Sequence, residues 1–153
     1  MSEFEYRTNS TIEALVSRLT SARSVMILSH EKPDGDAIGS CAVVARALDA
    51  LGIPSETWLL GAVADSLRSL IPDLSVRSIP GEVPEDDHDL IVLVDTGAWA
   101  QLAPMADFLR TRRERIIGID HHARGDDVAG ERIVDTSCGS CTQALIPLVD
   151  AMG

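Results

Sequence analysis

Aromatic residues and long apolar runs are both scarce in this 153-residue chain. Phe, Trp and Tyr make up 3% of the residues, so stacking platforms for single-stranded nucleic acid are nearly absent. No apolar run approaches the roughly 18 residues that a membrane span needs. The segment Met1–Tyr6 carries acidic residues and lacks the apolar core of a signal peptide. We therefore expect a cytoplasmic protein with no membrane partner.

Positively charged residues are also few. The chain has 13 Lys and Arg against 24 Asp and Glu, a formal net charge of −11, which argues against duplex nucleic acid as a partner. The same balance is compatible with a small phosphorylated ligand held through metal ions, because carboxylates gathered around cations add to such a count. Lys32, Arg124 and Arg132, the basic residues nearest the motifs below, are interpreted as solvated surface groups. Length and apolar content are typical of one globular domain.

Cysteine occurs three times, which provides no disulfide framework. Cys138 and Cys141 form a C-x-x-C near the expected start of a helix, a place that can lower a thiol pKa. A redox centre or half of a zinc site are the alternatives there. The pair lies near the end of the chain and no second pair accompanies it, so we interpret it as small residues that pack a helix start.

Short apolar runs alternate with helical patterns along the chain. Strands are expected at 25–28, 55–60, 90–94, 115–119 and 131–134, and the less regular middle holds a candidate strand at 76–79. Helices are expected at 11–22, 37–51, 64–70, 99–109 and 138–151, the last kinked or shortened by Pro147. The pattern predicts an α/β fold: a doubly wound, mainly parallel sheet of about five strands with helices on both faces. His88, in an acidic run, is expected to be a solvated loop residue.

The segment after the first apolar run, S-H-E-K-P-D-G-D-A-I-G-S, combines an imidazole with two carboxylates. His30, Asp34 and Asp36 lie in a turn whose backbone is shaped by Pro33 and Gly35. All three side chains are suitable ligands for Mn²⁺, and two Asp at a spacing of two project to the same side if the loop is extended. The alternative is a turn whose Asp residues only cap the following helix.

Two later apolar runs also end in polar side chains. Asp95 follows one of them, and Asp120, His121 and His122 follow the next. Because the carboxyl ends of parallel strands gather at one edge of a doubly wound sheet, these groups are expected in the ligand crevice there. The alternative for Asp95 is a helix cap, a role that Thr96 can also fill.

The strand-end groups suffice for two divalent cations with one bridging carboxylate. They are His30, Asp34, Asp36, Asp95 and His121. Such an arrangement is typical of a phosphoryl-transfer site, in which the metals activate hydroxide and polarise the phosphate. Adjacent His121 and His122 offer one ring to a metal and the other to a phosphate, and Asp120 can orient a neighbouring imidazole.

In combination, these motifs resemble the DHH phosphoesterase superfamily. The resemblance is carried by the first segment together with V-D-T-G, D-H-H and V-D-T-S-C-G-S-C-T, and it extends from about residue 10 to residue 153. The motifs are most similar to the nanoRNase/pAp-phosphatase branch, which acts on short oligoribonucleotides and on 3′-phosphoadenosine 5′-phosphate (pAp). The resemblance implies a Mn²⁺-dependent hydrolase whose partner is a small phosphorylated nucleotide or a short single-stranded RNA. A pyrophosphatase or polyphosphatase, a non-catalytic metal- or nucleotide-binding module, and the oligomeric state stay open.

The resemblance also implies a role for each metal ligand. One Mn²⁺ would be bound by His30 and Asp34 and the other by Asp36 and His121, and Asp95 would bridge the two.

The same resemblance implies the catalytic and substrate-binding residues. His122 would contact the scissile phosphate, Asp120 would support the site from behind, and Ser40 would also bind substrate. In this family a further Asp and a smaller substrate-binding domain follow the D-T-S segment, whereas this sequence stops at Gly153. We therefore expect residues 1–153 to form a single domain, a catalytic half with a weakened second metal site.

Overall fold

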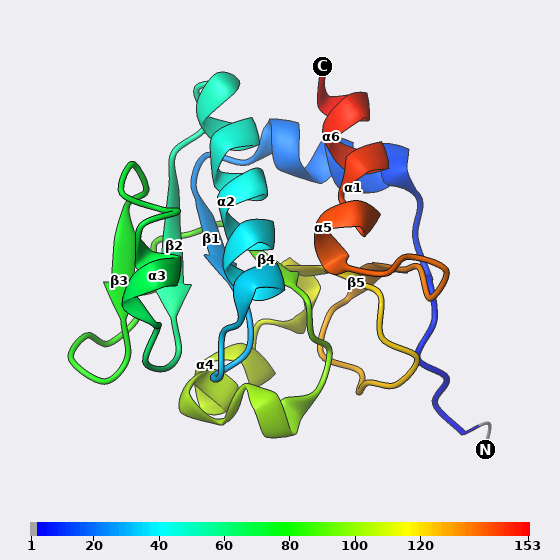
Figure 1. The fold of residues 1–153 in the computed structure, drawn as a ribbon. Helices are drawn as coiled ribbons and strands as arrows, with labels where there is room; N and C mark the ends of the chain where they lie inside the picture. The colour runs from blue at the N-terminus through cyan, green and yellow to red at the C-terminus, as the bar shows by residue number, and fades with distance from the viewer. Residues whose placement is uncertain (1–2) are drawn as a thin grey trace.

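The computed structural model describes residues 3–153, which form one six-stranded sheet flanked by helices (Figure 1). The strands are β1 (Val25–Leu28), β2 (Ser55–Leu59), β3 (Val76–Ser78), β4 (Leu90–Val94), β5 (Ile116–Asp120) and β6 (Glu131–Val134). Their order in the sheet is β3-β2-β1-β4-β5-β6, and each neighbouring pair is parallel. The predicted α/β fold is confirmed, and the candidate strand at the edge, β3, raises the expected five strands to six.

Helices cover both faces of the sheet. Alternate residues of each strand point to opposite sides, and in the central strands both sets of side chains are apolar and need to be buried. In β1, Val25 and Ile27 belong to one apolar core, and Met26 and Leu28 belong to the other. The first core is closed by α1 (Ile12–Ser21), α2 (Gly35–Ala50), α5 (Cys141–Ala144) and α6 (Ile146–Met152), and the second by α4 (Ala106–Arg110). A short helix, α3 (Asp65–Arg68), packs beside α2 and β2. Burial on both faces explains the continuous apolar runs.

Two of the predicted helices are interrupted near a proline. The helix expected over 138–151 consists of α5 and α6, separated at Leu145 shortly before Pro147. The helix expected over 99–109 begins with the 3₁₀ turns Trp99–Gln101 and Ala103–Met105, and only then becomes α4. Pro104, inside the second turn, lacks the N–H that a continuous helix would use. Another 3₁₀ turn, Arg113–Arg115, precedes β5. Within residues 3–153, no helix is both long and apolar enough to cross a membrane.

Two polar residues that were expected in solvent are buried. His88 is 6% exposed: its Nδ1 lies 2.7 Å from Oγ of Ser24, and its Nε2 lies 3.1 Å from Oε2 of Glu56. These contacts tie the loop before β4 to the starts of β1 and β2. Arg132 is also buried, and its Nε donates a hydrogen bond to the carbonyl oxygen of Arg7. Both expectations were wrong: the partners of His88 are distant in sequence, and Arg132 combines distant Arg7 with nearby Asp127 and Ala129.

The sheet reverses its winding direction between β1 and β4. The chain runs outward from β1 to β2 and β3, then returns to place β4 on the other side of β1. The carboxyl ends of β1 and β4 therefore flank a topological switch point, where sheets of this class bind ligands. The loops after β1, β4 and β5 bring the motif residues to this edge.

Candidate metal and phosphate site

The loop after β1 gives Asp34 two roles. Asp34 is the N-cap of α2, and its Oδ1 accepts a 2.9 Å hydrogen bond from the N–H of Ala37. The same Oδ1 lies 3.9 Å from Nε2 of His30. Since a carboxylate has a second oxygen and this side chain is largely exposed, the capping and ligand interpretations are compatible.

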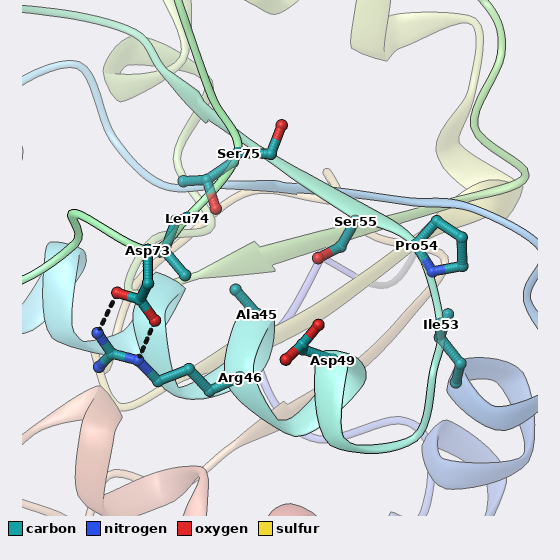
Figure 2. Close-up of a pocket in the computed structure, with 10 residues that line it drawn as sticks. Ala45, Arg46, Asp49, Ile53, Pro54, Ser55, Asp73, Leu74 and Ser75 are labelled. Carbon is teal, nitrogen blue, oxygen red and sulfur yellow. Dashed lines mark hydrogen bonds and ion pairs between the residues drawn. The ribbon is translucent and has the colours of Figure 1, made fainter.

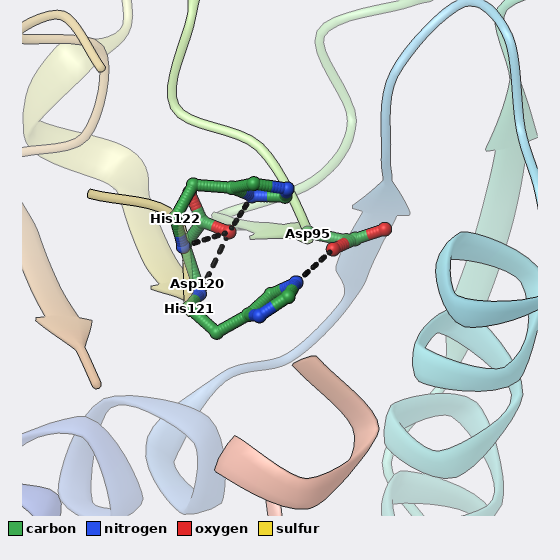
Figure 3. A group of neighbouring side chains, drawn as sticks. All are labelled: Asp95, Asp120, His121 and His122. Atoms are coloured by element: carbon green, nitrogen blue, oxygen red, sulfur yellow. Dashed lines mark hydrogen bonds and ion pairs between the residues drawn. The ribbon is translucent and has the colours of Figure 1, made fainter. Parts of the chain in front are cut away.

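Asp95 lies at the centre of the site. Its side chain is 3% exposed, and its φ of 63° is uncommon for a residue other than glycine. Oδ2 lies 3.5 Å from Nε2 of His30, and Oδ1 lies 3.3 Å from Nε2 of His121, a contact that Figure 3 shows. Asp95 does not cap the following turn, because Thr96 accepts the N–H of Ala98 there. One buried carboxylate thus faces imidazoles from the ends of two other strands.

The surroundings of Asp95 favour a bound cation. Burial raises the pKa of Asp95, and the negative charges of Asp36 and Asp34 raise it further. The hydrogen bond with His30 acts in the opposite direction and lowers it. That hydrogen bond in turn raises the pKa of His30. The buried Oδ1 of Asp95 has no hydrogen-bond partner within residues 3–153. An orphaned carboxylate oxygen near an imidazole nitrogen fits a divalent metal ion, which would satisfy both.

Asp36 is held beside His121 by the start of α5. Its Oδ2 accepts a 2.8 Å hydrogen bond from the N–H of Cys141 and lies 3.5 Å from Nε2 of His121. Its Oδ1 accepts hydrogen bonds from the N–H and the hydroxyl of Thr142, at 3.0 and 2.8 Å. Burial opposes ionisation, but these hydrogen bonds lower the pKa of Asp36. Asp36 is therefore an ionised group whose position is fixed from α5.

Two groups of possible ligand atoms share Asp95. One contains His30, Asp34 and Asp95, and the other contains Asp95, Asp120, His121 and His122; within each group the atoms lie within 4.8 Å of one another. Asp36 adjoins the second group without belonging to it. Ser40 is fully buried, with its Oγ 3.5 Å from Oδ1 of Asp36 and 3.3 Å from Oγ1 of Thr142. Its hydroxyl thus lies behind Asp36, and its contact with substrate stays a prediction, as do the individual metal ligands.

Asp120, the last residue of β5, supports His122 (Figure 3). Its Oδ1 accepts hydrogen bonds from Nδ1 of His122 at 2.7 Å and from the N–H of His121 at 2.8 Å. Its Oδ2 accepts a 2.8 Å hydrogen bond from the hydroxyl of Tyr6. Because both oxygens are engaged, Asp120 is better suited to orienting an imidazole than to binding a metal. His122 is 51% exposed, so its Nε2 is left to face a ligand.

Sequence reasoning missed Thr142 and Tyr6. Thr142 ends the last motif segment, and a hydroxyl residue at the start of a helix near the motifs was an available signal. Tyr6 precedes the first helix and lies outside every motif, so no pattern marks it. Burial, followed by the charge of Asp120, raises the pKa of Tyr6, which keeps its phenol protonated as a donor.

The two cysteines of the C-x-x-C segment, Cys138 and Cys141, have the properties of packing residues. Cys141 is buried, and its Sγ donates a hydrogen bond to the carbonyl oxygen of Ile119. Burial raises the pKa of both Cys138 and Cys141, the opposite of what a reactive thiol needs.

A separate cavity of about 360 Å³ lies between the end of α2 and the start of β2 (Figure 2). Its cation, Arg46, is neutralised by Asp73 through hydrogen bonds of 3.0 and 2.7 Å. The cavity lies at the amino end of β2, whereas the ligand groups lie at the carboxyl ends of the strands.

A protein family and a curated relative each match most of this chain. The model of the DHH family, N-terminal domain, matches residues 24–151. The bifunctional oligoribonuclease and PAP phosphatase NrnA of Thermus thermophilus is 32% identical over 133 residues, which cover 84% of this chain and 37% of that protein. The chain therefore spans little more than a third of this relative.

Two solved structures share the fold. An exopolyphosphatase-related protein from Bacteroides fragilis has a TM-score of 0.79 at 24% identity, over 93% of this chain and 43% of that one. The exonuclease RecJ bound to manganese has a TM-score of 0.55 at 17% identity, over 92% of this chain and 36% of that one. The family match includes all three loops that build the site, as the motifs predicted. The chain belongs to the DHH family and contains its N-terminal domain.

Proposed function

We propose that residues 1–153 form one domain, the metal-binding half of a phosphoesterase that hydrolyses short oligoribonucleotides, pAp, or both. The observation that carries this proposal is the buried Asp95 carboxylate, which faces His30 and His121 at the switch point of the sheet. The activities in the name of the Thermus thermophilus relative support the substrate class. Because the chain corresponds to 37% of that relative, the activity and the substrate of the whole protein are part of the proposal.

The donor set fits two Mn²⁺ ions, since imidazole nitrogens and carboxylate oxygens are ligands that Mn²⁺ accepts. His30 and Asp34 would hold one ion, Asp36 and His121 the other, and Asp95 would serve both. When bound, such ions supply an activated water and neutralise the charge of the phosphate.

The contribution of the protein's own side chains is to orient His122. The 2.7 Å hydrogen bond to Asp120 fixes Nδ1 of His122 toward the protein and turns Nε2 outward. When protonated, Nε2 donates a hydrogen bond to a phosphoryl oxygen, and this bond strengthens as negative charge grows there. Exposed His122 thus faces substrate, while buried Asp120 and Asp95 fix the groups around it.

The test is hydrolysis by the full-length protein with and without Mn²⁺. We expect Mn²⁺-dependent release of mononucleotides from di- to pentanucleotides, of phosphate from pAp, or of both. We expect Asp36→Ala to lower kcat/KM at least about tenfold, and Asp49→Ala, at the exposed far end of α2, to leave it unchanged. Full activity of Asp36→Ala would contradict the two-metal assignment.

Parallel reactions separate the alternatives. Preferred turnover of inorganic pyrophosphate or polyphosphate would make the protein a pyrophosphatase or polyphosphatase, a reading for which the exopolyphosphatase-related neighbour supplies a shared fold. One bound Mn²⁺ and no turnover of any of these substrates would instead indicate a non-catalytic binding module.

A further inference from the structure

We propose that Tyr6 is a positioning residue of this site: its hydroxyl fixes Asp120, and Asp120 fixes His122. Tyr6 lies in the N-terminal arm, residues 3–10, which precedes α1. The inference rests on the proposed function, because it takes His122 to be the group that contacts the phosphate. Tyr6 lies outside the 24–151 region matched by the family model, so no family motif assigns it a role.

The N-terminal arm is fastened along β6. The N–H of Asn9 donates to the carbonyl oxygen of Arg132 at 3.1 Å, and the N–H of Arg132 donates to Oδ1 of Asn9 at 2.7 Å. The hydroxyl of Thr8 donates to the carbonyl oxygen of Val134 at 3.1 Å and accepts from its N–H at 2.9 Å. Four hydrogen bonds over two consecutive residues thus set the position of the arm, and with it the position of Tyr6.

The ring of Tyr6 packs on two glycines from different loops. A Cβ atom added to Gly97, after β4, would overlap the ring and its hydroxyl, and one added to Gly125, after β5, would lie 2.6 Å from the ring. Glycine permits this close approach because it has no side chain. The guanidinium of Arg132 lies 5.8 Å from the ring centroid. The ring therefore bridges the loops that carry Asp95 and the paired histidines.

The hydroxyl of Tyr6 ends a chain of hydrogen bonds that reaches the exposed face of the site. It donates to Oδ2 of Asp120 at 2.8 Å, and Oδ1 of the same carboxylate accepts from Nδ1 of His122 at 2.7 Å. Within residues 3–153, the bond to Asp120 is the only hydrogen bond made by the ring of His122. Removing the hydroxyl would leave Oδ2 of a buried carboxylate without its donor, and Asp120 would then be held through Oδ1 alone. The orientation of His122 therefore depends on Tyr6.

Tyr6→Phe tests this inference in the full-length protein, because it keeps the packed ring and removes only the hydroxyl. Asn9→Ala is the matched control: it removes the two side-chain hydrogen bonds of Asn9, but the backbone bond of residue 9 and both Thr8 bonds still hold the arm, and Tyr6 keeps its hydroxyl. We expect Tyr6→Phe to lower kcat about tenfold with KM and Mn²⁺ affinity close to wild type. In proton NMR, we expect the hydrogen-bonded Nδ1–H of His122 to be observed in wild type and Asn9→Ala and to broaden in Tyr6→Phe.

The outcomes separate this inference from the proposed function. Wild-type kcat and an unchanged Nδ1–H signal in Tyr6→Phe would overturn the role of Tyr6 and leave the proposed function standing. The role of Tyr6 would also be overturned if Tyr6→Phe and Asn9→Ala lowered kcat equally and lowered the stability of the protein equally. The arm would then act only by stabilising the fold. No hydrolysis by wild type would reject the proposed function, and the NMR comparison would still decide whether Tyr6 fixes His122.

Discussion

The carboxylate of Asp36, at the start of α2, accepts a 2.8 Å hydrogen bond from the backbone N–H of Cys141, the first residue of α5. Thr142 adds a backbone and a hydroxyl donor to the same carboxylate. Asp36 thus ties two helices on one face of the sheet and is held 3.5 Å from His121. Its negative charge has a structural role whether or not it also binds a metal.

Asp36→Ala is therefore expected to destabilise the fold. Two N–H groups and one hydroxyl lose a charged acceptor, so the free energy of unfolding should fall by about 1–3 kcal/mol. Urea unfolding checks this, with Asp65→Ala in the exposed first turn of α3 as a control that should change it by less than about 0.5 kcal/mol. Equal losses in the two variants would contradict the anchoring role.

Glu131 makes part of the stability depend on pH. The hydroxyl of Ser10 at 2.7 Å and the guanidinium of Arg18 at 2.6 Å lower the pKa of Glu131 below its ordinary 4.5. A carboxyl group whose pKa is lower in the folded protein than in the unfolded chain stabilises the fold at pH values above its pKa in the unfolded chain. This contribution is lost as the pH falls through its pKa in the folded protein. Glu131→Gln should be less stable than wild type at neutral pH.

The measurement for Glu131 is urea unfolding of both proteins from about pH 7 to about pH 3. The difference should be constant at neutral pH and shrink below pH 4.5, the ordinary pKa of this side chain. A difference that stays constant over the whole range would show that the charge of Glu131 adds nothing to stability.

Gly125→Ala is expected to push Tyr6 away from the site. The added Cβ would lie 2.6 Å from the Tyr6 ring, and relieving this overlap should cost about 1–3 kcal/mol. Gly139→Ala is the control, because its Cβ would meet its nearest neighbour, Oε1 of Gln143, at an ordinary 3.7 Å. A lower thermal midpoint for Gly125→Ala alone is the expected result, and matching midpoints would be evidence against the packed ring.

Much of the fold, and the meeting of side chains at the strand ends, was predictable because the signals are local. The apolar run Leu90–Val94 marks a strand buried on both faces, and the polar residue that follows it, Asp95, lies at the carboxyl end of that strand. Parallel pairing then places Asp95 beside the ends of β1 and β5, where His30 and His121 lie. Strand ends and topology together were enough to predict which side chains meet.

The contacts that fix those side chains were not predictable, because they join residues far apart in sequence. The Tyr6–Asp120 hydrogen bond spans 114 positions and the Asp36–Cys141 bond spans 105. The burial of His88 depends on Ser24 and Glu56 in the same way. A single sequence carries no period or motif that reports such pairs, whereas the ends of strands are visible in it.

The proposed role of Asp95, a ligand shared by two metal ions, is tested most directly by calorimetric titration of the metal-free protein with Mn²⁺. Asp95→Asn keeps the shape of the side chain and removes the charge that faces His30 and His121. We predict that every Mn²⁺ site of the wild type weakens at least about tenfold in Asp95→Asn, while Asp49→Asn binds as wild type does. A titration of Asp95→Asn that superimposes on that of the wild type would contradict the account.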